Sequence, residues 1–293
     1  MGRGYRIFTD SSCDLTPQEL WKLGIESVQL GLSRGEEIYP DRDGCMPSVD
    51  EFYEMQLAST QLFKTSGVGL AEAIDVFESA LSKGQDVFYA GIDYELSTGS
   101  RTALYSAKEL LLEKYPAARI ELPNTHSIAP GLGLLLTKLS RIREDGAGLD
   151  EMLERLDYWS HHIAHWFSVD NFDQLYYSGR ATGIQKYLAT GFNIKPFMVL
   201  PHDGNLKVKK MARGEAGILK RFAEEVRDTI LEDDGEVWIS FGAESQLPRV
   251  NKLAEMIRAF KPKAKISLHR IGPVIGAHVG PTVIAVFFFA RER

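Results

Sequence analysis

Four short loops of this 293-residue chain carry side chains suited to holding an anion. They read TDSSCDLT (9–16), KTSGVG (64–69), YELSTGSRTA (94–103) and NTHSIAPGLG (124–133). Each offers Ser or Thr hydroxyls beside the backbone amides of a helix start, an arrangement that receives phosphate or carboxylate groups. The same hydroxyls are also ordinary helix caps, so a single loop predicts only a cap. Convergence of several loops on one sheet edge would indicate an anion site.

Candidate catalytic and metal-binding groups are few. Asp10 follows an apolar run, as phosphoryl-accepting aspartates do, but a capping or Asx-turn role is favoured for it. His161 and His165 are four residues apart on a predicted helix, yet no third ligand is evident, so a solvated or core pair is the interpretation. Cys13 and Cys45 lack metal-ligand spacing. With no G-x-S-x-G, Walker A or G-x-G-x-x-G motif, we predict no catalytic residue, no metal and no cofactor.

The composition limits the classes of partner that the protein is expected to bind. The net charge of -6 and a single short basic run, KVKKMAR, weigh against a nucleic-acid partner. The start MGRGYRIFTD shows no long apolar segment of the signal-peptide kind, so we expect a cytoplasmic protein. The most apolar stretch, 283–290, is too short for a membrane span and predicts a buried strand.

The first half of the sequence alternates between strand-like and helix-like patterns, which predicts a parallel sheet covered on both faces. Thr16 as N-cap, Pro17 at the first helical position and Gly24 as the stop predict one helix. The pattern LAEAIDVFESALSKG places Leu70, Ile74, Phe77 and Leu81 on one helix face. The further predicted strands are YRIFTD, IESVQLGL, DVFYAGID and RIELPNT, and the further helices are SVDEFYEMQL, 98–114 and 129–143.

The second half of the sequence shows a different order of predicted helices and strands. A helix over about 149–165 is followed by IKPFMVL and LKVKKMA, and the Asp203-Gly204 turn between them predicts an antiparallel hairpin. Helices at about 215–231 and 247–260 alternate with the strands EVWISFGA and AKISLHRIG and the final strand. We therefore predict an α/β fold of two domains: residues 1–160 with a parallel sheet, and residues 161–293 with a mixed or antiparallel sheet.

Six motifs in a fixed order extend over essentially the whole chain: TDSSCDL, EFY…KTSG, LSTGS, NTHSIAPGLG, SGR…GFNIKPFMVL…DG and IGPVIGAHVGPT. In this order they resemble the DegV family of bacterial fatty acid-binding proteins. The resemblance implies one long-chain fatty acid bound between the two domains, with its acyl tail in the C-terminal domain. It also implies that the protein presents this fatty acid to a separate fatty acid kinase, which forms an acyl phosphate for phospholipid synthesis.

The resemblance also implies which residues form the site. The carboxylate is expected at Thr65, Ser97 and His278, with Ser66 and Thr98 as adjacent candidates. Arg180, in the SGR motif, is expected to contact the partner or, transiently, a membrane; a surface ion pair is the plainer alternative.

Three functions remain open from the sequence. The leading hypothesis is a non-enzymatic lipid carrier. The alternative is a phosphotransferase or hydrolase acting on a small anionic substrate through Asp10 or His278, since the same loops would serve it. A pure interaction module is weaker, because an apolar channel would then have no purpose.

Overall fold

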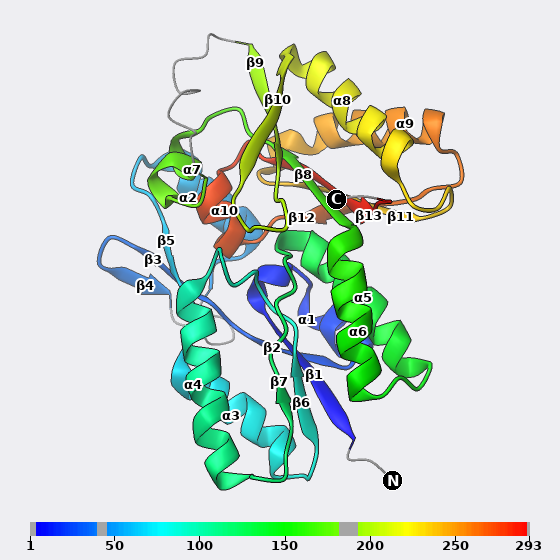
Figure 1. The fold of residues 1–293 in the computed structure, drawn as a ribbon. Helices are drawn as coiled ribbons and strands as arrows, with labels where there is room; N and C mark the ends of the chain where they lie inside the picture. The colour runs from blue at the N-terminus through cyan, green and yellow to red at the C-terminus, as the bar shows by residue number, and fades with distance from the viewer. Residues whose placement is uncertain (1–3, 40–45, 182–192, 292–293) are drawn as a thin grey trace.

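Two open β-sheets organise the chain, one from each half of the sequence (Figure 1). The computed structural model describes residues 4–39, 46–181 and 193–291, so Cys45 lies outside the described residues. The first sheet has the strand order β2-β1-β6-β7 and every pair in it is parallel, which confirms the predicted parallel sheet. Its strands are β1 (Tyr5–Asp10), β2 (Ile25–Val28), β6 (Asp86–Tyr89) and β7 (Ile120–Glu121). The predicted strand RIELPNT is only two residues long, because Pro123 cannot donate to a neighbouring strand.

Helices cover both faces of the first sheet, as the alternation predicts. Consecutive strand residues point to opposite faces, and so Ile7 and Phe88 belong to one core while Phe8 and Val87 belong to another. The helices α1 (Pro17–Leu23) and α5 (Ala129–Glu144) contribute to the first core, and α3 (Leu70–Leu81) and α4 (Thr98–Lys114) to the second. Helix α1 begins and ends as predicted, since Thr16 forms a capping box and Gly24 adopts φ 59°.

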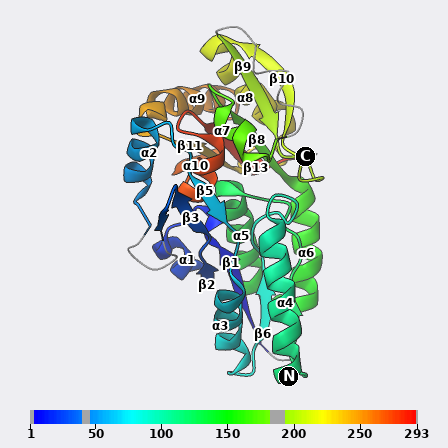
Figure 2. The same cartoon turned by 90° about the vertical axis from the view of Figure 1, so that its left-hand side faces the viewer.

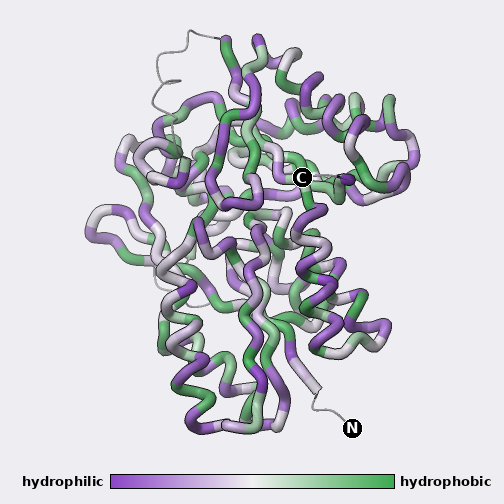
Figure 3. The backbone as a smooth tube through the Cα atoms, viewed as in Figure 1, coloured by the Kyte–Doolittle hydropathy of each residue, from purple (hydrophilic) through white to green (hydrophobic). Residues whose placement is uncertain are grey.

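One residue of the predicted apolar face of α3 is misplaced. Leu70 is 40% exposed, whereas Ala73, Phe77, Ala80 and Leu81 are buried. Leu70 opens the helix, so it extends past the edge of the core that the later turns fill. The mixture of hydrophilic and hydrophobic residues along this and the other outer helices is visible in Figure 3.

The second sheet is mixed, as predicted. Its order is β10-β9-β8-β13-β11-β12, and β11–β12 is the parallel pair among otherwise antiparallel neighbours. One face packs against α8 (Gly214–Thr229) and α9 (Leu247–Phe260), and the other faces α5. The strands are β8 (Ile163–Ser168), β9 (Ile194–Val199), β10 (Lys207–Arg213), β11 (Glu236–Phe241), β12 (Lys265–Arg270) and β13 (Ile284–Phe289). The predicted hairpin is β9–β10, and part of the segment before β9 lies outside the described residues.

The predicted helix over 149–165 is too long. Helix α6 (Leu149–His162) ends at His162, and the next six residues form β8, all of them buried. β8 pairs residue by residue with β13 from Ile163↔Phe289 to Ile284↔Ser168, and this pairing overrides the helical pattern. The predicted helical spacing of His161 and His165 is therefore wrong, because His165 lies in a strand.

The predicted strand IESVQLGL is in fact two strands. β2 pairs with β1, and the chain then crosses to a three-stranded sheet of order β4-β3-β5. The crossing is fixed by Leu30, whose backbone N–H donates to Ser11 Oγ over 2.9 Å. This sheet contains β3 (Gly31–Arg34), β4 (Glu37–Tyr39) and β5 (Lys64–Ser66), and α2 (Val49–Ala58) packs beside it.

The two halves meet along an extensive apolar contact. One core cluster contains Phe88 of the first sheet, Leu132 of α5 and Phe287 of the second sheet. Helix α10 (Pro273–Val279), which the sequence analysis did not identify, lies at this junction beside β3 and β5 (Figure 2). The last strand of the first sheet ends at residue 121, and the first strand of the second sheet begins at residue 163. The domain boundary at residue 160 stays a prediction.

Candidate functional site

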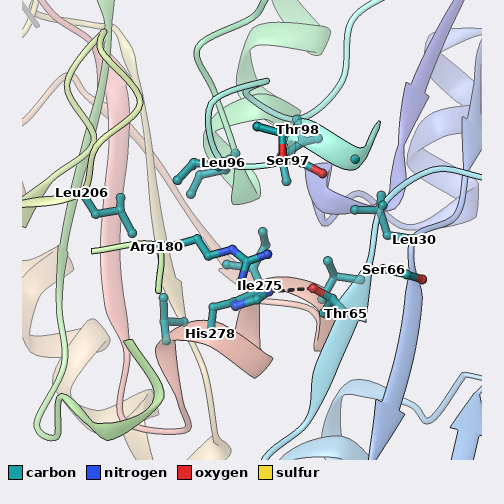
Figure 4. A pocket seen from close by; sticks show the side chains of 16 residues that line it. Leu30, Thr65, Ser66, Leu96, Ser97, Thr98, Arg180, Leu206, Ile275 and His278 are labelled. Atoms are coloured by element: carbon teal, nitrogen blue, oxygen red, sulfur yellow. Dashed lines mark hydrogen bonds between the residues drawn. The ribbon is translucent and has the colours of Figure 1, made fainter. Parts of the chain in front are cut away.

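A cavity of about 170 Å³ lies where β5, the start of α4 and α10 meet. All six residues singled out by the sequence line it, although they come from four separate parts of the chain: Thr65, Ser66, Ser97, Thr98, Arg180 and His278. Figure 4 shows the Arg180 and His278 side chains next to each other, with Thr65 beside His278 and Ser97 and Thr98 across the cavity. Two of the four hydroxyl-rich loops, 64–69 and 94–103, therefore bring their hydroxyls to one cavity, and the loop 124–133 contributes the apolar Ile128.

His278 and Thr65 form the polar centre of the cavity. The Thr65 hydroxyl lies 2.8 Å from Nε2 of His278, and the other ring nitrogen, Nδ1, is buried without a hydrogen-bond partner in the described part of the chain. Burial, and then the positive charge of Arg180, lower the pKa of His278 to about 4. The imidazole is therefore neutral at pH 7. If Nε2–H donates to Thr65, the threonine hydroxyl can donate its own proton to a ligand.

Ser97, at the start of α4, lies on the cavity wall opposite His278 (Figure 4). It is the N-cap residue, but its side chain makes no capping hydrogen bond; Ser97 Oγ lies 2.8 Å from Ser100 Oγ instead. Ser100 Oγ in turn accepts from the backbone N–H of Val68 over 3.0 Å, which ties the 64–69 loop to α4. A Cβ on Gly67 would lie only 2.7 Å from the Ser100 backbone nitrogen, so only glycine permits this approach. The positive end of a 17-residue helix thus adjoins the cavity.

Arg180 lines both the cavity and a groove on the outer side of it. It follows α7 (Asp173–Ser178), a short helix closed by Gly179 at φ 68°, and its guanidinium donates to the Ser178 carbonyl. It also lines an outer groove of about 410 Å³ that shares Thr65 and His278 with the cavity. No ion pair in the described ranges includes Arg180, so the structure does not support the surface ion pair considered from the sequence.

An apolar cavity adjoins the polar one. Its volume is about 30 Å³, and the two share Ile128, Leu206, Ile275 and Val279. The apolar part reaches His165 of β8 and Phe287 of β13, and so extends into the second sheet. The polar cavity between the halves and the apolar cavity beside the second sheet therefore adjoin each other along these four residues.

Asp10 lies away from this site. It is fully buried and does not line the cavity. One carboxylate oxygen accepts from the Ser12 backbone N–H at 3.0 Å and from the Ser12 hydroxyl, and the other accepts from Tyr89 OH at 2.6 Å and the Ile92 N–H at 2.8 Å. The capping role favoured for it is confirmed, and the carboxylate has no open face toward a substrate.

In the described residues no group of three or more His, Cys, Asp or Glu side chains could hold a metal ion. Asn124 accepts from the Tyr94 N–H at 3.1 Å and holds its own loop rather than lining the cavity. Sequence reasoning missed Leu206 and Ile275, because apolar wall residues from separate elements carry no local pattern.

The chain is similar to known proteins over nearly its whole length. A "DegV domain-containing protein" of Clostridium perfringens is 30% identical over 287 residues, covering 98% of each chain. The solved structure of a fat acid (stearic acid)-binding protein from Eubacterium ventriosum is 26% identical, has a TM-score of 0.84 and covers 98% of each chain.

Two further solved structures share the fold. The Thermus thermophilus structure described as fatty acid binding of a DegV family protein has a TM-score of 0.85 at 22% identity, and covers 98% of this chain and 99% of its own. The Streptococcus pneumoniae fatty acid kinase B3 protein, loaded with linoleic acid, has a TM-score of 0.83 at 20% identity, and the match covers 98% of this chain and 99% of that protein. A family model described as "Uncharacterised protein, DegV family" matches residues 5–291. The chain therefore belongs to the DegV family.

Proposed function

We propose that this protein binds one long-chain fatty acid, with the carboxylate among Thr65, Ser66, Ser97, Thr98 and His278 and the acyl tail in the apolar cavity. The observation that carries the proposal is the adjacency of the two cavities, which share four lining residues and place hydroxyls and a neutral imidazole at one end and apolar side chains at the other. The fatty acids named for the Eubacterium ventriosum and Streptococcus pneumoniae relatives support the ligand class.

The energetics of such a ligand are favourable. A carboxylate taken out of water must regain hydrogen bonds, and the hydroxyls, the start of α4 and Arg180 supply donors. Burial of apolar carbon contributes about 0.8 kcal/mol per methylene, so a sixteen-carbon tail contributes roughly 10 kcal/mol before the cost of immobilising it and of widening the apolar cavity, whose volume of about 30 Å³ is too small for the tail. The tail thus supplies affinity and the polar end fixes orientation.

The same proposal includes a carrier role. The bound acid would be presented to a fatty acid kinase, which makes an acyl phosphate for phospholipid synthesis, and Arg180 would contact that partner or, transiently, a membrane surface. The outer groove beside Arg180, with Tyr177 68% exposed, opens the carboxylate end to a partner. In the described ranges no helix has both the length and the apolar character to cross a bilayer.

A carrier is favoured over an enzyme because Asp10 is fully engaged in the core. A turnover screen with acyl and phosphate esters tests this directly. Turnover that is lost in Asp10→Asn and indifferent to bound lipid would support the phosphotransferase or hydrolase hypothesis instead.

The ligand is tested on protein purified from bacteria. Organic extraction and mass spectrometry should recover about one fatty acid per chain from the wild type and clearly less from the double variant Thr65→Ala/Ser97→Ala. Thr229→Ala, which removes an α8 hydroxyl that bonds to the Glu225 carbonyl far from the cavity, is the matched control and should load normally. Absence of stoichiometric fatty acid from the wild type would refute the proposal.

A further inference from the structure

One aromatic side chain of the central strand of the second sheet lines the apolar cavity. Phe287 lies on β13, which follows α10 in the chain, and it is 3% exposed. It lines the apolar cavity but not the polar one. We propose that the Phe287 ring limits the length of the acyl chain that the protein accepts, because the chain ends against it. The inference rests on the proposed fatty acid site and adds the class of fatty acid that fits.

The inner face of β13 changes from small to large side chains along the cavity. Alternate residues of a strand point to one face, and so Val283, Ala285 and Phe287 all line the apolar cavity. The Val283 N–H donates to the Gly280 carbonyl over 3.5 Å, which places the start of this row at the end of α10. Each second residue lies about 7 Å further along the strand. An acyl chain that extends from His278 therefore passes the small Ala285 before it meets the Phe287 ring.

The Phe287 ring has an aromatic neighbour on each side in the sheet. In the strand register, Phe287 lies opposite His165 of β8 and opposite Trp238 of β11. The Phe287 and His165 rings meet edge to face, with 5.3 Å between their centroids. Trp238 is buried, and its ring stacks on that of His269 at 3.9 Å. Side chains directly opposite each other on one face lie about 5 Å apart, so the Phe287 ring has no room to move sideways across the sheet.

Helix α5 covers the Phe287 ring from the side of the first sheet. A Cβ on Gly131 would lie only 2.6 Å from Phe287 Cδ1, so the helix backbone rests directly against the ring. The neighbouring His165 ring is fixed as well. Its Nε2 accepts from the Ile128 N–H over 3.4 Å, and its Nδ1 lies 3.3 Å from the Ile163 carbonyl oxygen. A long acyl chain therefore meets a wall that cannot move aside without displacing α5.

Much of the remaining cavity wall is aliphatic and can adjust to a tail. The volume of about 30 Å³ requires that a bound tail widen the cavity. Leu200, Leu206 and Ile275 line it, and side chains of this kind have several staggered rotamers. Phe287, by contrast, is enclosed by α5 and by two aromatic neighbours. We therefore expect the tail to widen the cavity at the aliphatic side chains, while the end at Phe287 stays in place.

Beyond Phe287 the same face of β13 reaches the outside of the protein. Phe289, the next residue on that face, lines a groove of about 330 Å³ together with Lys138 and Trp159. The Phe289 and Trp159 rings meet edge to face, with 4.8 Å between their centroids. Along the strand, Phe287 thus lies between the apolar cavity and this groove. A smaller side chain at position 287 would extend the cavity toward the groove and make room for a longer chain.

The length limit is tested by competitive loading. Protein stripped of lipid is offered an equimolar ladder of saturated fatty acids, from lauric to behenic acid, in phosphatidylcholine vesicles, and the bound acids are identified by mass spectrometry. We expect the wild type to prefer one length and to bind longer acids poorly. Each further methylene that becomes buried is worth about fourfold in affinity. Phe287→Ala should therefore raise the bound share of acids roughly two to four carbons longer by about tenfold or more, relative to the preferred acid.

The matched control is Phe288→Ala. Phe288 is the next residue of β13 and is fully buried, but it belongs to the core on the opposite face of the sheet. This variant loses the same ring and should keep the wild-type distribution of lengths. Phe287→Leu, which leaves less space, should shift the distribution in the same direction by a smaller amount, and it serves as the test if Phe287→Ala does not fold. Ala285→Val, which narrows the cavity before Phe287, should shift the distribution to shorter acids.

The outcomes separate the length limit from the proposed ligand. A folded Phe287 variant with the wild-type distribution, or an equal shift in Phe288→Ala, would overturn the length limit and leave fatty acid binding standing. A wild type that takes up all lengths equally would do the same. Wild-type protein that takes up no acid of any length would instead overturn the proposed function, and the length limit with it.

Discussion

The Thr65 hydroxyl oxygen lies 2.8 Å from Nε2 of His278, although 213 residues separate the two in the chain. Thr65 is held by its pairing with Leu32 in the small sheet, and His278 by the last turn of α10. Because the lowered pKa keeps the imidazole neutral, the pair offers hydrogen bonds without a fixed charge. Among the lining residues in the described part of the chain, Arg180 is the one that brings positive charge to this end of the cavity.

Thr65→Val keeps the shape of the side chain and removes its hydroxyl. If that hydroxyl donates to a carboxylate, the affinity for a long-chain fatty acid should fall by roughly 10- to 100-fold, the effect of a hydrogen bond to a charged group. Thr65→Ser keeps the hydroxyl and should bind within about threefold of the wild type. Titration calorimetry measures both. Equal affinity of Thr65→Val and the wild type would remove Thr65 from the carboxylate site.

The lowered pKa of His278 makes stability depend on pH. The unfolded chain takes up a proton near pH 6.5, whereas folded His278 does so only near pH 4. Unfolding is therefore favoured as the pH falls from 6.5 to 4, by on the order of 3 kcal/mol in total, and the effect is absent above pH 6.5. Urea unfolding of ligand-free protein should show a flatter pH dependence for His278→Gln. Identical slopes for the two proteins would show that the imidazole titrates normally.

The sequence was sufficient for the features that local physics determines. Helix α4 spans 98–114 and α9 spans 247–260, both as predicted, and Thr16 with Gly24 bounds α1. The order of the motifs also led to a set of site residues that do line one cavity.

The features that the sequence did not predict depend on partners distant in the chain. The local pattern predicts β8 as the end of a helix, because it does not show the pairing of β8 with β13. It likewise predicts β3 as part of β2, because it does not show the pairing of β3 in the small sheet. The proximity of Arg180 to His278, and the contribution of Leu206 to the cavity wall, result from how the two halves pack. The hydrophobic periodicity within a single segment does not indicate such a contact.

Gly131 lets α5 approach two side chains that line the apolar cavity. A Cβ at this position in α5 would lie 2.4 Å from His165 Nε2 and 2.6 Å from Phe287 Cδ1, and both side chains line the cavity. Gly131→Ala should therefore destabilise the protein by about 1–3 kcal/mol and weaken fatty acid binding. Gly217→Ala is the matched helical control, since its Cβ would meet only Ala212 at 3.7 Å, and it should be neutral or stabilising by up to about 1 kcal/mol. Urea unfolding distinguishes them; equal stability of the two variants would contradict the close contact.

Asp10 is expected to act in folding rather than in chemistry. Asp10→Asn replaces one acceptor oxygen with an NH₂ group that faces the backbone N–H of either Ser12 or Ile92, and neither N–H can act as an acceptor. Stability should fall by about 1–3 kcal/mol, while the fatty acid recovered per folded chain stays unchanged. Urea unfolding and mass spectrometry of the same sample measure the two quantities. Full stability in Asp10→Asn would contradict the structural role.

Arg180 and His278 should be linked electrostatically, and removal of the arginine tests the link. Burial is the larger cause of the low His278 pKa and the Arg180 charge is the second, so Arg180→Met should raise that pKa while leaving it below 6.5. Arg180→Lys keeps a positive charge at the same position and should change the pKa less. The imidazole C–H resonances, followed by NMR from about pH 3.5 to 7.5, report the titration, and His278→Gln assigns the signal. A pKa that stays the same or falls in Arg180→Met would show that the guanidinium does not act on His278, and would leave burial as the whole cause of the neutral imidazole.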